Sequence, residues 1–455
     1  MIFFGERVNL MKRYPAYKNS GVEWIGEIPE HWTNSKIKYN TYVKGRIGWQ
    51  GLTTSEYIDE GPFLVTGTDF KKGVVDWTTC HHVSEDRYDQ DEYIQLQEND
   101  LLITKDGTIG KIALAKNLQA KATLNSGVFV TRPRNGTYTN DFMFCILNSK
   151  IFDEYIEFIK TGTTISHLYQ NTFVEFAYPL PGADEQEQIA NYLHHKTHLI
   201  DTLIEKKQKQ IELLQEQRAT IINQAVTKGL NPNIKMKGSG IEWLGEVPEH
   251  WQTTRLKFET SHIVDCLHST PVYSESGGYP AIRTADVSPG VLNLADVRFV
   301  DEEEHKQRIG RLQPEAEDIL YSREGERFGM AALVPHDVDL CLSQRMMMFR
   351  TGKNINPTFL MWQLNSRFVY YQASQDVIGA TSPHVNVKTI RNFSLVMPPY
   401  KEQTEIAKKI HTECANIDVI IVSISRVIST LQEYRTTLIS NVVTGKIDVR
   451  DEAIP

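Results

Sequence analysis

Apolar residues recur at helical spacing through the C-terminal segment 401–446. They are separated by alternating steps of four and three residues, and the one polar break in the series is Arg435. The apolar positions are Ile410, Cys414, Ile417, Ile421, Ile424, Ile428, Leu431, Leu438 and Val442. A seam that repeats every 3.5 residues is typical of a coiled coil. The pattern therefore predicts one long helix that buries its seam against a second helix.

The second helix is predicted 217 positions earlier, in segment 184–228. Shifting the seam back gives ten positions, of which seven are apolar, and Arg218 falls at the step that Arg435 occupies. The apolar ones are Leu193, Ile200, Ile204, Ile211, Leu214, Ile221 and Ala225. An antiparallel pair would place the domain preceding each helix at opposite ends of a rod. From Leu193 to Ala225 the rod rises roughly 50 Å at about 1.5 Å per residue.

The residues before each long helix have a different composition. They are rich in Val, Ile, Thr, Tyr and Phe, and turns of Gly, Pro, Asn and Asp interrupt them. Such stretches indicate short strands. A helix is predicted at 141–160 in the first stretch and at 357–374 in the second. The fold class is therefore α+β, with two domains of mixed strands and helices separated by a long antiparallel two-helix coiled coil.

The chain is one unit written twice. Residues 20–32 read SGVEWIGEIPEHW and residues 239–251 read SGIEWLGEVPEHW, with ten of thirteen positions identical. NDLLITKDGTIG from Asn99 likewise matches EDILYSREGERFG from Glu317, and EQEQIA from Glu185 matches EQTEIA from Glu402. The predicted segments are an N-terminal extension (1–19), a first domain (20–180), a first helix (181–230), a second domain (231–397), a second helix (398–449) and a tail (450–455).

Charge and cysteine content narrow the class of protein. The net charge of -8 excludes a uniformly basic nucleic-acid binder, so positive charge for DNA would have to be gathered locally. Five scattered cysteines without a CxxC pair suit the reduced thiols of a cytoplasmic protein and predict neither a disulfide frame nor a metal site. No unbroken apolar run reaches the roughly 18 residues of a membrane span, so no membrane partner is expected.

The repeated boxes, the two strand-to-glycine turns and the two EQ-x-x-I helix starts occur together, in this order and spacing. In these features the chain resembles, over nearly all its length, the specificity subunit of type I restriction-modification systems. The resemblance implies a non-catalytic subunit whose two target-recognition domains read a bipartite, asymmetric site in double-stranded DNA. It also implies two modification subunits that methylate adenine with S-adenosylmethionine, and two restriction subunits that use ATP and Mg²⁺. No cofactor is expected in this chain itself.

Two other functions stay open from the residues alone. Met397-Pro398-Pro399-Tyr400 is similar to the N-P-P-Y motif of amino-methyltransferases, but Met397 offers no amide to accept a hydrogen bond from the target amine. An autonomous DNA methyltransferase is therefore the weaker alternative, and a helix start is the preferred interpretation of the motif. The second alternative is a coiled-coil adaptor with two peptide-binding domains. His194 and His198 lie one helical turn apart without a third ligand, which favours solvent-facing histidines over a metal site.

Candidate DNA contacts are basic residues near predicted turns, because Lys and Arg supply both phosphate and base contacts. In the first domain they are Lys105, Lys71, Lys72 and Arg46, with Arg132 and Arg134 ranked below them. In the second domain they are Arg323, Arg327, Arg283 and Arg345. Lys105 and Arg323 rank highest because each precedes a strand-to-glycine turn that presents a side chain outward. For each, a solvated charge or an ion pair is the alternative.

A last pair of matched segments surrounds two histidines. Gly162, Thr164 and His167 align with Gly379, Thr381 and His384. We expect each segment to form a turn that seats its domain on the long helix. Direct contact of the histidines with DNA is the alternative.

Overall fold

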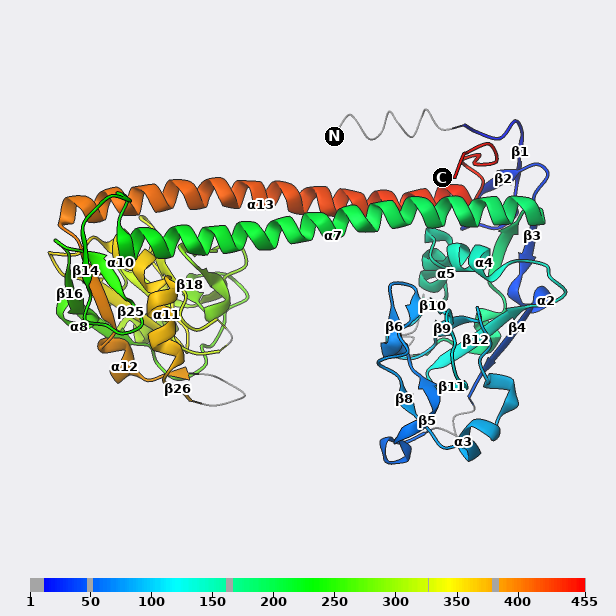
Figure 1. Cartoon of the computed structure of the whole chain (residues 1–455), viewed down its shortest axis with the longest axis horizontal. Coiled ribbons are helices and arrows are strands. Elements are labelled where there is room, and N and C mark those ends of the chain that lie inside the picture. Colours follow the sequence, from blue (N-terminus) through cyan, green and yellow to red (C-terminus); the bar gives the residue numbers. More distant parts are fainter. Residues whose placement is uncertain (1–11, 47–51, 161–166, 326, 379–383, 455) are drawn as a thin grey trace. The chain divides into compact units, whose positions relative to one another are not determined.

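The secondary structure repeats in the same order in both halves of the chain (Figure 1). The computed structural model describes residues 12–46, 52–160, 167–325, 327–378 and 384–454. These residues form two compact units. Unit 1 combines the chain up to Lys207 with Arg426 onward, and unit 2 is Gln208–Ser425.

Unit 1 is built on a mixed sheet with the strand order β4-β12-β9-β10-β7-β6 and a smaller sheet with the order β11-β5-β8. The strands of these two sheets are β4 (Thr41–Gly45), β5 (Ile58–Val65), β6 (Phe70–Lys71), β7 (Val74–Val75), β8 (His81–His82), β9 (Leu101–Thr104), β10 (Ile112–Leu114), β11 (Ala122–Leu124) and β12 (Val128–Pro133). Two antiparallel pairs complete the unit: β1 (Tyr17–Asn19) with β2 (Glu27–Pro29), and β3 (Thr33–Lys36) with β13 (Ala177–Leu180). Its shorter α-helices are α2 (Ile37–Asn40), α3 (Glu85–Asp89), α4 (Asn140–Leu147), α5 (Lys150–Lys160) and α6 (Gln170–Phe173).

Unit 2 repeats this plan, with β17-β25-β22-β23 in place of β4-β12-β9-β10 and β21-β18-β24 in place of β8-β5-β11. Its strands are β14 (Met236–Gly238), β15 (Glu246–Pro248), β16 (Gln252–Arg255), β17 (Thr260–Asp265), β18 (Tyr279–Ile282), β19 (Val287–Ser288), β20 (Val291–Leu292), β21 (Arg298–Val300), β22 (Ile319–Ser322), β23 (Ala331–Leu333), β24 (Cys341–Leu342), β25 (Met346–Thr351), β26 (Val377–Ile378), β27 (His384–Val385) and β28 (Ser394–Met397). Its shorter α-helices are α8 (Leu256–Glu259), α9 (Glu302–Ile309), α10 (Pro357–Leu364), α11 (Arg367–Ser374) and α12 (Val387–Arg391). The matching strand orders confirm that one fold occurs twice.

The two long helices are α7 (Ala183–Lys228) and α13 (Tyr400–Val443), and each continues from one unit into the other. In unit 1 the first half of α7 packs on the last half of α13, where Leu193 and Ile200 share a core with Leu431 and Leu438. In unit 2 the last turns of α7 pack on the first half of α13, where Ile222 shares a core with Ile410 and Cys414. The helices are thus antiparallel in both units, and every predicted seam residue is buried or half-buried.

The polar break in each seam is an ion pair. Arg435 donates two hydrogen bonds to Asp201 in unit 1, at 2.9 and 3.2 Å. In unit 2, Arg218 lies 3.4 Å from Asp418. The duplication relates the two pairs, since each residue of one lies 217 positions from its equivalent in the other. The break is therefore part of the repeated register between the helices.

Helix α13 is also apolar on part of its outer surface. One 18-residue window has a mean hydropathy of 1.6, which by length and composition alone would suffice to cross a membrane. A single helix of this kind is weak evidence for a membrane span, because a packed helix passes the same test. Its seam residues Ile417 and Leu431 are buried against α7, but only 22% of the window is buried, and Val419, Val422 and Val427 are exposed.

Three sequence-based boundaries are wrong. The helix predicted at 141–160 is two helices, α4 and α5, because Ser149 turns its hydroxyl back to the carbonyl of Ile146 and the chain bends there. Its counterpart at 357–374 is likewise α10 and α11, and Ser366 caps the second of these. Helix α13 ends at Val443 rather than at 449, since Gly445 adopts φ +71° and turns the chain.

The N-terminal extension also joins the fold sooner than predicted. From residue 12 onward the segment packs on unit 1, where Tyr14 is buried. The backbone N–H of Asp448 donates to the carbonyl of Lys12, and the Tyr17 hydroxyl donates to the carbonyl of Gly445. The segment before β1 and the segment after α13 therefore hold each other in place.

Candidate nucleic-acid interface

The repeated tryptophan box holds each domain on the start of its long helix. Trp32 is fully buried, and its indole N–H donates to Glu185 at 3.0 Å. Trp251 makes the same bond to Glu402 at 3.2 Å. The carboxylate of Glu185 also accepts from the hydroxyl of Tyr14 at 2.6 Å. Both box and helix start are kept in the two halves because each half needs this attachment.

The glutamine next to each of these glutamates ties in a further element. Gln186 donates to the carbonyls of Pro181 and Thr137, and its own carbonyl accepts from the backbone N–H of Thr139, the N-cap of α4. Gln403 bonds in the same way to Pro398, Asn354 and Asn356 in unit 2. The carbonyl of Pro398 is thus engaged within the fold, and Met397-Pro398-Pro399-Tyr400 forms the predicted helix start.

The two highest-ranked candidates lie on equivalent turns. Lys105 follows β9 and its backbone N–H donates to the carbonyl of Gly127 at 2.9 Å, while Arg323 follows β22 and donates to that of Arg345 at 3.1 Å. Gly107 and Gly325, at φ +69° and +81°, allow each turn its left-handed step. The two turns begin alike, but the second is one residue longer: Gly110 N–H returns to the carbonyl of Thr104, whereas Gly329 N–H returns to that of Ser322.

Lys105 and Arg323 are held in contrasting ways. The ammonium of Lys105 lies 5.0 Å from the centre of the Phe129 ring, and burial lowers the pKa of Lys105 below its usual value. Arg323 is only 9% exposed in its side chain, and it bonds to Asp265 at 3.1 Å and to Glu324. Arg323 is therefore an anchor inside the turn, whereas Lys105 has no carboxylate bonded to it among the hydrogen bonds of the described residues.

Two of the other first-domain candidates are already engaged within unit 1. Arg46, a candidate DNA contact, is 1% exposed and donates to the carbonyl of Leu124 at 2.8 Å and to Thr123 at 3.2 Å. Burial also lowers the pKa of Arg46. Lys72 lies on the β6–β7 hairpin and pairs with Glu205 of α7. Lys71, beside it, is exposed.

The lower-ranked pair divides in the same way. Arg132 bonds to Asp100 at 2.6 and 2.7 Å, and its carboxylate partner is buried. Arg134 is exposed.

The second-domain candidates divide similarly. Arg283 binds both oxygens of Asp286, at 2.6 and 3.0 Å, and these bonds raise the pKa of Arg283. Arg327 is exposed, although one of its nitrogens donates to the carbonyl of Ala285. Arg345 has φ +73° and a side chain 48% exposed, with Glu324 3.8 Å away. A bulky residue in the left-handed region is uncommon and is enriched at functional sites.

The matched histidines lie beside the turns. His167 bonds to Asp106, and the N–H of Leu168 donates to the carbonyl of Lys105 at 2.7 Å. His384 pairs with Glu324 through a backbone bridge in unit 2. These contacts support the turns, and the expectation that the matched segments seat each domain on its helix stays a prediction. Gly162, Thr164, Gly379 and Thr381 lie outside the described residues.

Sequence reasoning missed a pair of exposed aromatic residues. Tyr39 is 66% exposed with the ammonium of Lys38 5.2 Å from its ring centre, and Phe258 is 70% exposed with Lys257 at 5.1 Å. The segments KIKYN and RLKFE lie at equivalent positions, so their basic-aromatic pattern was the available signal. Because it recurs in both halves, this surface suits a contact shared by both domains.

The comparisons with known proteins agree with this duplicated frame. The family model described as type I restriction modification DNA specificity domain matches residues 51–213 and 249–420. The chain belongs to this specificity family. Each matched stretch covers most of one domain and part of the long helix that follows it.

Individual members of the specificity family match almost end to end. The specificity subunit of the type I restriction enzyme MjaVIII of Methanocaldococcus jannaschii is 26% identical over 435 residues, which is 93% of this chain and 95% of that protein. The EcoKI specificity subunit of Escherichia coli (strain K12) is 20% identical over 93% of this chain and 90% of that protein. A solved structure, described as addressing complex assembly and conformational transition of the type I R-M system, has a TM-score of 0.67 at 13% identity. It covers 91% of this chain and 98% of that one, and it supports the fold.

Substituting Lys105 is expected to weaken binding to target DNA more than binding to other DNA. Lys105→Ala should lower affinity for the target by about tenfold, close to 1.4 kcal/mol, because Lys105 is held in a fixed position that suits base contact. Lys71→Ala should weaken target and non-target binding alike and flatten the salt dependence, as expected for an exposed phosphate contact. Gel shifts of the assembled complex over a salt series would measure both. Equal loss on both DNAs for Lys105→Ala would contradict the assignment.

Proposed function

We propose that this chain is the DNA-recognition subunit of a type I restriction-modification complex, and that its two domains read the two parts of an asymmetric split site. The contrast between the halves supports this most directly. The attachment residues Glu185 and Glu402 each bond to the tryptophan and the histidine of their own box. The turns that follow β9 and β22 differ, with Lys105 in one unit and Arg323 in the other. The two halves thus share the attachment of the domain to its helix but differ in the turn residues. This difference suits two domains that recognise different DNA sequences.

The partners we propose are two copies of a modification subunit and two of a restriction subunit, together with double-stranded DNA in the cytoplasm. Leu203 and Ile420 are equivalent positions on α7 and α13, and they are 41% and 44% exposed. A repeated exposed apolar residue suits a partner bound in two copies. We propose that this partner is the modification subunit. S-adenosylmethionine, ATP and Mg²⁺ would act in the partners.

Within the complex, this chain would contribute recognition and position rather than chemistry. The methyltransferase-like motif supports this, because Met397 has no acceptor for the target amine and the Pro398 carbonyl already accepts from Gln403 at 2.9 Å. The buried attachment of each domain would keep its turn at a set orientation to the helices. The modification subunit would then meet DNA at a place chosen by these turns.

Reconstitution tests this proposal. The purified chain alone should transfer no methyl group, and addition of the modification subunits should yield adenine methylation at one split sequence. Methyl transfer by the chain alone would contradict it. A gel shift over a salt series separates the peptide-binding adaptor, since DNA binding weakens steeply with salt.

A further inference from the structure

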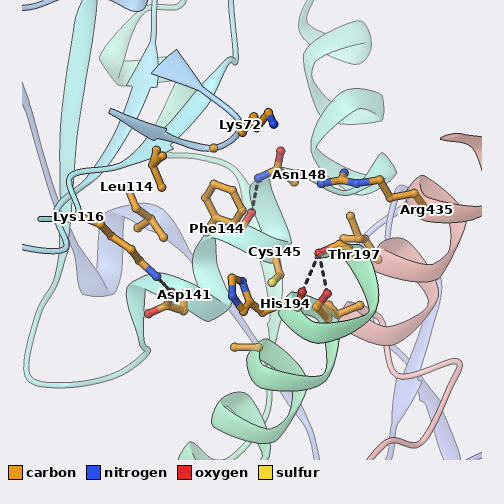
Figure 2. Close-up of a pocket in the computed structure, with 15 residues that line it drawn as sticks. Lys72, Leu114, Lys116, Asp141, Phe144, Cys145, Asn148, His194, Thr197 and Arg435 are labelled. Carbon is orange, nitrogen blue, oxygen red and sulfur yellow. Dashed lines mark hydrogen bonds and ion pairs between the residues drawn. The ribbon is translucent and has the colours of Figure 1, made fainter. Parts of the chain in front are cut away.

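A cavity of about 130 Å³ lies in unit 1 between the first domain and the helix pair. Figure 2 shows Phe144 and Cys145 of α4 between Leu114 on one side and Thr197 and Arg435 on the other. Gly73 and Val74 of the β6–β7 hairpin, Ala190 and Leu193 of α7, and Ile439 of α13 also line it. Three parts of the fold therefore meet around one space: the hairpin, α4 and the long helices.

The equivalent place in unit 2 is filled by an indole ring. Trp362 of α10 is 2% exposed and packs so closely on Gly290 of the β19–β20 hairpin that a Cβ there would lie 2.3 Å from the ring. The guanidinium carbon of Arg218 on α7 lies 5.7 Å from the ring centre. Hairpin, helix and ring thus form one packed layer.

The register of the duplication shows which residue replaces this ring in unit 1. Asn148 and Asn365 are equivalent, since each donates its amide N–H to a carbonyl four residues earlier, in α4 and α10 respectively. Counting three residues back from each gives Cys145 and Trp362. Gly73 corresponds to Gly290 and Arg435 to Arg218, and both of these unit 1 residues line the cavity. The cavity lies beside Cys145, at the position of Trp362 in the other half, but in unit 1 the ring of Phe144 covers the hairpin glycine, 2.6 Å from a Cβ placed on Gly73.

We propose that this cavity is a binding site for a small planar aromatic molecule of the indole class. Apolar cavities of about 150 Å³ stay dry and bind benzene, so a space of this size and lining suits one or two fused rings. The proposal does not depend on DNA recognition by the chain. It assigns a ligand to a space between a recognition domain and the helices that carry it.

Several of the polar groups that line the cavity already have partners. Lys116 pairs with Asp141 at 2.8 Å, and Arg435 pairs with Asp201. The hydroxyl of Thr197 donates to the carbonyl of Leu193 at 2.7 Å. Burial raises the pKa of the Cys145 thiol to about 12, so this side chain is a neutral, weakly polar wall. An uncharged ring that enters the cavity would therefore not have to separate these charged groups from their partners.

Indole binding to the full-length chain tests the site. Calorimetric titration with indole should show saturable binding at one site. Indole at ten times its Kd should raise the thermal midpoint of unit 1 by about 4 °C. Cys145→Trp should fill the space as Trp362 does in unit 2, and it should abolish both signals. Cys145→Ser keeps the space open and is the matched control, which should still bind.

The reciprocal exchange moves the site. Trp362→Cys should open the same space in unit 2, lower the thermal midpoint of that unit and create a second indole site that restores it. If Trp362→Cys fails to fold, the comparison of Cys145→Trp with Cys145→Ser still decides. Absence of saturable binding to the wild-type chain would overturn the proposal. So would unchanged indole binding in Cys145→Trp.

Discussion

Replacing Glu185 with alanine is expected to destabilise unit 1 by about 3 kcal/mol, since two buried donors lose their acceptor. The Trp32 indole N–H and the Tyr14 hydroxyl both point to this carboxylate, which is 10% exposed. Burial and the neighbouring carboxylate raise the pKa of Tyr14, so its hydroxyl remains a donor across the working range of pH. Urea unfolding followed by tryptophan fluorescence would measure the change.

The duplication supplies an internal control for this experiment. Glu402→Ala removes the bonds to Trp251 and His250, but Glu402 is 26% exposed and has no counterpart of Tyr14 among its bonds. Its expected loss, in unit 2, is about 2 kcal/mol. Glu187→Ala, an exposed position on the same helix turn, should change stability by less than about 0.5 kcal/mol. An effect of Glu185→Ala no larger than that of Glu187→Ala would show that the buried bonds are not stabilising.

Adding one heptad to both long helices should move methylation to sites with a longer gap. Seven residues inserted between Lys207 and Gln208 and seven between Ser425 and Arg426 preserve the seam, and they add about 10 Å at 1.5 Å per residue. At about 3.4 Å per base pair the gap should grow by about three base pairs, with methylation at the original sites falling to background. Mapping of methylated adenines across a genome carrying the altered system would measure this.

Two outcomes of the insertion experiment would count against the spacing role of the helices. One is an unchanged gap, and the other is a change in the bases read at either half. Four residues inserted into α7 alone should displace one seam against the other, so loss of activity or an altered gap is expected there. The separation of the two reading domains stays a prediction of the sequence, and this pair of variants is its direct test.

The frame was the more predictable part of this molecule. The matching boxes, the helix starts and the 3.5-residue seam are local patterns, and local patterns are visible in one sequence. Hence α7 was placed within two residues at each end. The end of α13 was missed because Gly445 and the residues after it contact the N-terminal segment, more than 400 positions away in the chain.

The reading residues were less predictable, because a basic side chain takes its role from partners distant in sequence. Arg323 is held by Asp265, which lies 58 residues before it. Nothing in the sequence near the turn indicates that this carboxylate is its partner. Arg46 is enclosed by a carbonyl 78 residues later. The sequence alone does not show whether an arginine is exposed or buried, so only the fold distinguishes exposed Arg345 from buried Arg46.

The attachment of each domain through Glu185 and Glu402 bears on how such proteins diversify. A few side chains at the start of each helix attach the domain to it, and none of them lies on the turns that differ between the halves. Mutations can therefore accumulate on one turn while assembly with the partners is inherited intact. A lineage could in this way acquire a new methylation motif by changing one half of the gene, and its sister half would keep the old half-site.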